Sequence, residues 1–252
     1  MNMKNISRNL LLEEPLLSSI ENPFERFYKY RALADFPDRD RSNTAKDVYK
    51  KLGWYCENTD KKILEPDTFF ASSHNLVRNL LRKHDSKYYE NHYREYCIAQ
   101  GIDYDYLDNH NAKYYRYLWM TDPNVTEHYN YIINEKSLLA YIEATHEIGN
   151  FLIVPKKFGS KKARKFKECP IQSLQYIQDN WNMYSESYHG ITFEVWKELH
   201  ILEDCFTNSN LKSSLIIDCT KPFADIFNTL EEITEQINKR NHKIILRLNT
   251  GK

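Results

Sequence analysis

Apolar residues recur at helical spacing along most of this chain. Three stretches show the pattern most clearly, and each predicts an amphipathic helix that buries one face. They cover residues 73–84, 136–148 and the C-terminal region from about residue 228. Their apolar stripes are Leu76, Val77, Leu80 and Leu81; Leu138, Leu139 and Ile142; and Leu230, Ile233, Ile237, Ile244 and Leu248.

Capping residues mark the ends of several further helices. Asn22, followed by Pro23 and Glu25, predicts a helix start, because Asn caps free backbone N–H groups and Pro suits the first turn. Gly53 and Gly101 predict helix ends. The dipeptide Asp85-Ser86 predicts a break between one helix ending near residue 84 and another covering 87–100.

Two short apolar runs predict strands. Phe151–Val154 precedes Pro155, and residues 214–219 contain Leu215, Ile216 and Ile217. Together these patterns predict a mainly α fold of the α+β class. We expect a single helical domain over residues 1–252, with a small two-strand β element. The acidic stretch 103–111 is the only domain boundary that the sequence indicates.

Composition narrows the class of protein. Thirty-five basic residues balance 35 acidic ones, so no overall charge attracts the chain to nucleic acid or membrane. No run reaches the about 18 apolar residues of a membrane span, and no signal peptide is evident. Five widely spaced cysteines without a C-x-x-C pair argue against disulfides or structural zinc. We therefore expect a cytoplasmic protein that has no membrane partner and no metal site.

One segment departs from this charge balance. Residues 156–167 contain seven basic residues, no acidic residue and two phenylalanines, Phe158 and Phe166. Basic side chains bind phosphates and aromatic rings stack on bases, so the segment is a candidate nucleic-acid contact; the alternative is a solvated lysine-rich loop. The candidate binding residues are Lys156, Lys157, Lys161, Lys162, Arg164, Lys165 and Lys167.

Three other segments carry a family resemblance. Residues 145–155 resemble the T-I-G-N-F-x-x-x-P signature of a family of uncharacterised bacterial proteins. That family also has a G-D-T-x-x-S segment, matched here by Asp67, Thr68 and, one residue later, Ser72, with Pro66 in place of the glycine. Residues 238–241, followed by Ile244, are similar to the end of that family. The resemblance implies no activity.

The same residues 145–155 allow two other interpretations. They resemble the H-x-L-G-N-L-T-L stretch in the nuclease domain of modified-DNA restriction enzymes, which would make His146 catalytic, although the upstream H-I-x-P segment of that domain is absent. The structural interpretation is a helix that ends at Gly149 and Asn150 in left-handed conformation, followed by a core strand.

Arg78 and His84 suggest a second catalytic hypothesis. Their spacing resembles the R-x₄₋₆-H motif of helical ribonucleases in toxin and abortive-infection systems, and Asn79 matches the polar residue after the arginine. Such an arginine could hold a phosphate while the histidine transfers a proton. The alternative is that His84 closes a helix, where a cation interacts favourably with the helix dipole.

These features lead to one functional expectation and one alternative. We expect a bacterial or phage-encoded protein that contacts RNA or DNA in a defence or toxin system. Whether it is an enzyme is left open; a nuclease with Arg78, His84 and His146 as catalytic candidates is the first hypothesis. The alternative is a non-catalytic interaction module that binds another protein or a second copy of itself. The sequence leaves open which cofactor, if any, the protein uses.

Overall fold

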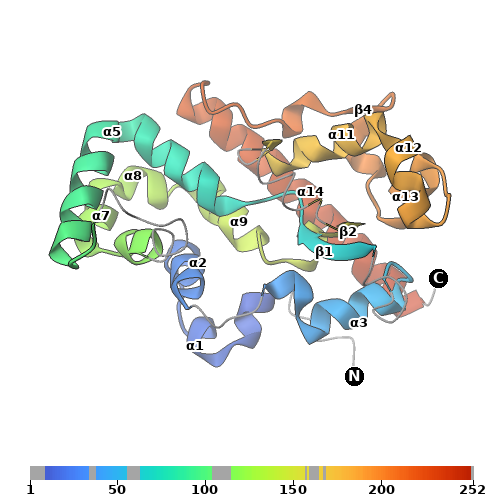
Figure 1. The fold of residues 1–252 in the computed structure, drawn as a ribbon, viewed down its shortest axis with the longest axis horizontal. Helices are drawn as coiled ribbons and strands as arrows, with labels where there is room; N and C mark the ends of the chain where they lie inside the picture. The colour runs from blue at the N-terminus through green and yellow to red at the C-terminus, as the bar shows by residue number, and fades with distance from the viewer. Residues whose placement is uncertain are drawn as a thin grey trace.

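The computed structural model describes residues 9–33, 38–55, 63–103, 115–156, 158, 165–166 and 169–250. Over these ranges the chain is mainly helical with two small antiparallel two-stranded sheets, which confirms the predicted fold class (Figure 1). The strands are β1 (Leu64–Thr68), β2 (Phe151–Pro155), β3 (Phe206–Thr207) and β4 (Asn210–Leu211). The main helices are α1 (Pro15–Ser18), α2 (Pro23–Ala32), α3 (Asn43–Lys51), α5 (Ser73–Ala99), α7 (Pro123–His128), α8 (Asn130–Ile133), α9 (Lys136–Ala144), α11 (Ser173–Asp179), α12 (Trp181–Tyr184), α13 (Phe193–Leu199) and α14 (Phe223–Thr250).

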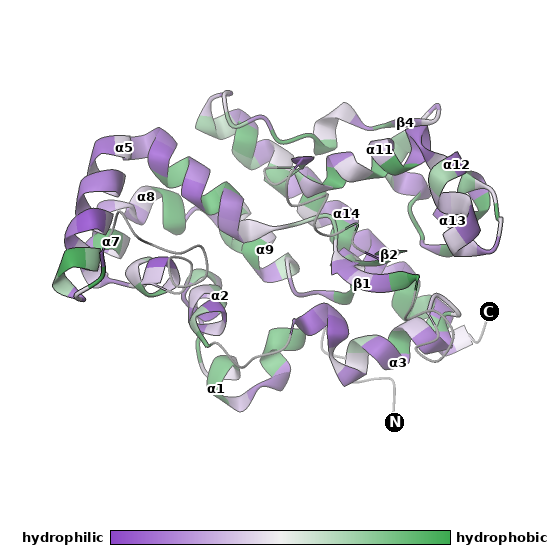
Figure 2. Cartoon of the chain, in the orientation of Figure 1, coloured by the Kyte–Doolittle hydropathy of each residue, from purple (hydrophilic) through white to green (hydrophobic). Residues whose placement is uncertain are grey.

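Helix α14 crosses the middle of the molecule, with α5 and α7 to one side in Figure 1 and α11 to α13 to the other. It packs against α9 and against the 3₁₀ turn η5 (Ile148–Asn150). Figure 2 shows hydrophobic and hydrophilic positions alternating along α14, as expected of an amphipathic helix. The predicted stripe is buried from Leu230 to Ile244, and the helix begins at Phe223, about a turn earlier than its pattern indicates.

The predicted helix signals at Asn22 and Asp85 act as expected. The side-chain oxygen of Asn22 accepts hydrogen bonds from the backbone N–H groups of Phe24 (2.8 Å) and Glu25 (3.2 Å). At Asp85 the backbone of α5 leaves helical geometry, with φ −151° and ψ 90°. The Asp85 carboxylate then accepts a 2.9 Å hydrogen bond from the N–H of Tyr88, so it caps the second half of the helix.

Strand β2 lies at the predicted place, but its partner does not. It pairs antiparallel with β1, with Leu64 opposite Pro155 and Thr68 opposite Phe151. The prediction of a strand at residues 214–219 is wrong: the 3₁₀ turn η9 (Ser213–Leu215) lies there, followed by irregular chain. Leu215 and Ile217 are nevertheless buried, which accounts for the apolar run that resembles a strand.

Gly149 ends no helix. Helix α9 already stops at Ala144, and Gly149 does not belong to the glycines with positive φ, which among the described residues are Gly53, Gly101 and Gly190. The predicted left-handed stop is therefore wrong. Gly149 lies against α14, where an added Cβ would collide with the carbonyl oxygen of Ile237 and lie 2.7 Å from Oδ1 of Asn241. Close approach of two backbones requires the glycine.

Most buried apolar side chains of the described ranges form one continuous cluster. A smaller cluster consists of Leu11, Leu17 of α1 and Tyr30 of α2. The stretch 103–111, the predicted domain boundary, lies outside the described residues except for Asp103. Among the helices that the structure describes, none combines the length and the apolar character that crossing a membrane requires.

The close approach at Gly149 gives a direct test of this packing. Gly149→Ala should lower the free energy of unfolding by about 3 kcal/mol, because the new methyl group meets a backbone carbonyl that cannot rotate away. Urea denaturation measures the loss. Gly53→Ala is the control: Gly53 has φ +67° and no atom within 4 Å of an added Cβ. This control should lose only about 1 kcal/mol for the left-handed backbone. Equal losses in the two variants would contradict the packing argument.

Candidate functional site

A polar cavity of about 190 Å³ lies where α2, the 3₁₀ turn η3 (Arg39–Arg41), the end of β1, the start of α5 and the end of α9 meet. Two of the three segments that carry the family resemblance contribute to its wall: Asp67, Thr68 and Ser72 come from one, Thr145 and His146 from the other. The remaining described residues of the wall are Phe27, Tyr30, Arg31, Asp38, Arg39, Asp40, Ser73 and His74.

Asn150 joins these two segments. Its fully buried side-chain oxygen accepts hydrogen bonds from the N–H groups of Phe70 (2.7 Å) and Ala71 (2.8 Å). Its side-chain nitrogen donates to the carbonyls of Ala71 (3.0 Å) and Thr145 (2.6 Å). The amide therefore has all four of its hydrogen bonds, and it holds the chain between β1 and α5 against the end of α9.

Two buried side chains of helix α14 hold the same junction in place. The guanidinium of Arg240 donates to the carbonyls of Gly149 (2.6 Å), Phe151 (2.7 Å) and His200 (2.8 Å). The side chain of Asn241 accepts from the N–H of Gly149 at 2.5 Å and donates to the carboxylate of Glu147. Together these contacts fix the backbone that leads from α9 into β2.

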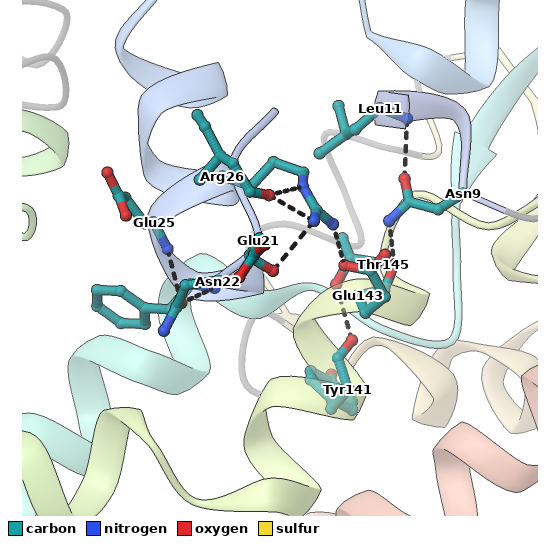
Figure 3. A network of polar contacts seen from close by, with 11 residues as sticks. Asn9, Leu11, Glu21, Asn22, Glu25, Arg26, Tyr141, Glu143 and Thr145 are labelled. Carbon is teal, nitrogen blue, oxygen red and sulfur yellow. Dashed lines mark hydrogen bonds and ion pairs between the residues drawn. The ribbon is translucent and has the colours of Figure 1, made fainter. Parts of the chain in front are cut away.

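A second network fixes the N-terminal side of the cavity (Figure 3). Arg26 of α2 forms a 2.7 Å ion pair with Glu143 of α9 and also donates to the carbonyl of Ile20. Asn9 donates to the carbonyl of Glu143 at 3.1 Å and accepts from the N–H of Leu11. These bonds hold α2, and with it Phe27, Tyr30 and Arg31, next to the end of α9.

His146 differs from its neighbours in the segment. The hydroxyl of Thr145 is hydrogen-bonded to that of Ser73, and Glu147, Gly149 and Asn150 have the partners given above. The imidazole of His146 is 5% exposed and packs against the rings of Phe27 and Tyr30, with centroid distances of 5.7 and 4.9 Å. Its Nδ1 has no hydrogen-bond partner among the described residues.

The surroundings keep this imidazole neutral. Burial, and after it the positive charges of Arg31 and Arg39, lower the pKa of His146 to about 3. Arg39 is paired with Glu14 at 2.7 Å, and Arg31 lies 3.6 Å from the carboxylate of Asp38. At neutral pH the imidazole is therefore uncharged, with one ring nitrogen that can donate and one that can accept a hydrogen bond, and it is a weak proton acceptor.

The three catalytic candidates do not gather at this cavity. His146 lines it, whereas the described residues of its wall include neither Arg78 nor His84. Both residues follow His74 along α5, Arg78 by about 6 Å and His84 by about 15 Å at the rise of an α-helix. His84 lies at the kink of α5, exposed, with the rings of Tyr129 and Phe223 at 5.9 and 6.3 Å.

The basic segment is described only in part. Its residues Lys157, Lys161, Lys162, Arg164 and Lys167 lie outside the described residues. Phe158 is buried, stacked on Phe69 at 6.2 Å and edge-on to Tyr184 at 5.8 Å, so its ring belongs to the core. The ammonium group of Lys165 lies 5.0 Å above the ring of Tyr176, and Phe166 contacts the same ring.

Other parts of the described chain offer less chemistry. A larger cavity of about 610 Å³ lies beside the start of α2, α7 and α8, but its described wall contains no histidine, arginine or lysine. No group of three or more His, Cys, Asp or Glu side chains in the described ranges is arranged to hold a metal ion.

Comparisons of the chain with protein-family models, curated proteins and solved structures found no match. The chemistry of the cavity therefore follows from its own residues alone. Sequence patterns single out His146 as a site residue, and the family resemblance includes Asp67, Thr68 and Ser72. They miss Arg31, Arg39, Asp40 and His74, for which no motif or spacing gives a signal.

The neutral state of His146 predicts a pH dependence of stability. Between pH 3 and 6.5 the unfolded chain binds a proton at this residue that the folded chain does not. Folding is therefore destabilised as the pH falls, by about 1.4 kcal/mol per pH unit from this histidine. His146→Gln should reduce the slope of unfolding free energy against pH by about that amount between roughly pH 4 and 6.

Urea denaturation across this range provides the measurement. His242→Gln, at an exposed position of α14, controls for the removal of a histidine that is not buried. A slope that His146→Gln leaves unchanged, or that both variants change equally, would contradict the buried neutral imidazole.

Proposed function

We propose that this protein binds nucleic acid and that residues 156–167 contact the phosphate backbone. Seven basic side chains within twelve residues, with no acidic residue among them, supply the charge. The rest of the chain carries 28 basic and 35 acidic residues. This excess of negative charge cannot neutralise the segment at a distance, because salt screens charges beyond about 8–10 Å. Neutralising phosphates releases counterions, which is the main source of sequence-independent affinity for nucleic acid.

The contact between Phe158 and Phe69 supports the proposal most directly. The ring of Phe158, the third residue of the basic segment, stacks on Phe69, which directly follows Thr68 in the wall of the His146 cavity. A nucleic acid held by the segment would therefore pass close to the cavity. Lys165 is positioned by the ring of Tyr176 at the other end of the segment. Both ends of the basic segment thus contact the folded body through aromatic rings.

We further propose a cytoplasmic role in a bacterial or phage-encoded defence or toxin system, with a nuclease as the first enzymatic hypothesis. The support for this is the resemblance of Arg78 and His84 to the ribonuclease motif, together with the basic segment. The position of His146 in a polar cavity gives a second place where a phosphodiester could be held.

A protein interaction module is the second candidate, and an apolar surface favours it. Val195 and Leu199 of α13 are 42% and 43% exposed, and Leu246 of α14 is 55% exposed. The two helices meet there, because the guanidinium of Arg247 donates to the carbonyl of Leu199 at 3.1 Å. Exposed apolar side chains on adjacent helices are typical of protein contact surfaces.

The nucleic-acid proposal predicts the effect of removing charge. Replacing Lys161, Lys162, Arg164 and Lys165 by Gln should weaken binding to a mixed-sequence oligonucleotide. It should also lower the slope of log affinity against log salt by about 0.7–0.9 for each phosphate that the variant no longer neutralises. Thermal stability should change little, because exposed charges contribute little to folding. Fluorescence anisotropy at several salt concentrations measures affinity and slope, and a thermal melt measures stability.

A matched variant separates local from global charge. Lys50, Lys51, Lys87 and Lys221 are exposed on other parts of the fold, and changing them to Gln removes the same four charges. This control should keep nearly the parental affinity. If the parent does not bind, or if the two quadruple variants bind alike, the nucleic-acid proposal is wrong and the interaction module becomes the leading function.

A further inference from the structure

We infer that Cys169 and Cys219 form a reversible disulfide when the protein meets hydrogen peroxide, and that Cys219 is oxidised first. Both residues are reduced thiols in the structure. The bond would tie the chain that follows the basic segment to the turn that precedes α14. The inference does not depend on the proposed nucleic-acid binding. It rests on the contacts of Cys169, on the different exposure of the two residues and on the space beside the turn.

The sulfur of Cys169 lies against the chain that leads to Cys219. It accepts a hydrogen bond from the backbone N–H of Ile217 at 3.2 Å and lies 3.7 Å from the carbonyl oxygen of Leu215. Cys219 follows Ile217 by two residues, which is at most about 7 Å of extended chain. Along this stretch Leu215 and Ile217 are buried, Asp218 is exposed and Cys219 is half-buried again. Cys219 therefore faces inward, toward the side on which Cys169 lies.

The two thiols differ in their exposure, which assigns them different roles. Cys169 is 2% exposed, and burial raises its pKa to about 11, with a smaller contribution from the nearby Cys219. A thiol held protonated in this way reacts poorly with peroxide, because the thiolate is the nucleophile. Cys219 is only half-buried and is open to a small solute. Peroxide therefore meets Cys219 first, and Cys169 is placed to react with the product.

A cavity beside the turn leaves room for the movement that a disulfide requires. Its volume is about 210 Å³, and it separates the chain before α14 from the first turns of that helix. The described wall contains Ile216, Asp218 and Lys221 on one side and Asp225, Ile226 and Thr229 on the other. Residues 216–221 are therefore not fixed by close packing against α14 here. They can shift to bring the two Cβ atoms to the roughly 3.8 Å of a disulfide.

The reaction balances with hydrogen peroxide as the only oxidant. The thiolate of Cys219 attacks one peroxide oxygen, the O–O bond breaks, and the other oxygen leaves as hydroxide, which a proton converts to water. Cys219 is then a sulfenic acid. The sulfur of Cys169 attacks the sulfenic sulfur, the S–O bond breaks, and the hydroxyl group leaves as water with the proton of Cys169. Two thiols and one peroxide thus give one disulfide and two water molecules.

Peptide mapping after oxidation tests the inference on the full-length protein. The reduced protein is treated with a small excess of hydrogen peroxide at about pH 8, where an ordinary thiol is partly ionised. The remaining thiols are then alkylated, and the peptides are identified by mass spectrometry without reductant. The parent should yield two peptides joined through Cys169 and Cys219, and dithiothreitol should separate them. Cys219→Ser should yield no such pair, and it should fold normally because the side chain is half-buried and serine has a similar shape.

Cys205 provides a matched control for Cys169. It is also buried, at 3% exposure, and burial raises the pKa of its thiol to about 12. Cys205→Ser should give the same yield of the joined pair as the parent. Cys169→Ser should lose the pair but keep a sulfenic acid at Cys219, which dimedone labels. A thermal melt of each variant shows that it is folded.

The parent protein alone is enough to overturn the inference. Dimedone labelling of Cys219 without a joined peptide would mean that the two sulfur atoms do not meet. A disulfide that joins Cys219 to Cys56, Cys97 or Cys205 would contradict the pairing, and an unoxidised Cys219 would contradict its reactivity. None of these results bears on oligonucleotide binding, so the inference and the proposed function can fail separately.

Discussion

The arrangement of this fold depends on the hydrogen bonds that the buried guanidinium of Arg240 donates. It donates to three carbonyl oxygens in two distant parts of the chain: those of Gly149 and Phe151, and that of His200. The rings of Trp54 and Phe70 cover its charge at 5.0 and 5.5 Å. Carbonyl groups buried at this depth need hydrogen-bond donors. Helix α14 therefore has to pack against the start of β2 in one fixed position along its axis. Burial is so complete that it lowers the pKa of Arg240 to about 9.

The position of the candidate site follows from this packing. Once α14 holds Gly149 and Phe151, the side chain of Asn150 points to the chain between β1 and α5 and bonds Phe70 and Ala71. The ends of β1 and α9 then form two walls of one cavity. The cavity is therefore formed by the same hydrogen bonds that hold the core together. A binding site supported in this way is already ordered before a ligand arrives, which keeps the entropic cost of binding low.

Local patterns predicted much of the fold and little of the site. The capped start of α2, the break at Asp85 and the buried strand β2 depend on residues near in sequence, so patterns of three to eight residues could identify them. Strand β1 has the sequence Leu-Glu-Pro-Asp-Thr, in which neither apolar alternation nor strand propensity is visible. The reason for Gly149 lies far along the chain, at Ile237. Arg39 and Asp40 belong to a polar loop whose burial depends on distant contacts such as the ion pair with Glu14.

The two buried histidines show why geometry, and not burial or pKa, identifies the candidate site. In both His146 and His200 burial is the main cause that lowers the pKa to about 3, and arginine side chains add to the effect. His200 closes α13: its Nδ1 lies 3.0 Å from the carbonyl of Trp196, and aromatic rings fill the space around it. His146 instead borders a cavity that also contains carboxylates and hydroxyls. A perturbed histidine is common wherever a core is aromatic and dense, so only the space beside His146 and the polar groups across it point to a ligand.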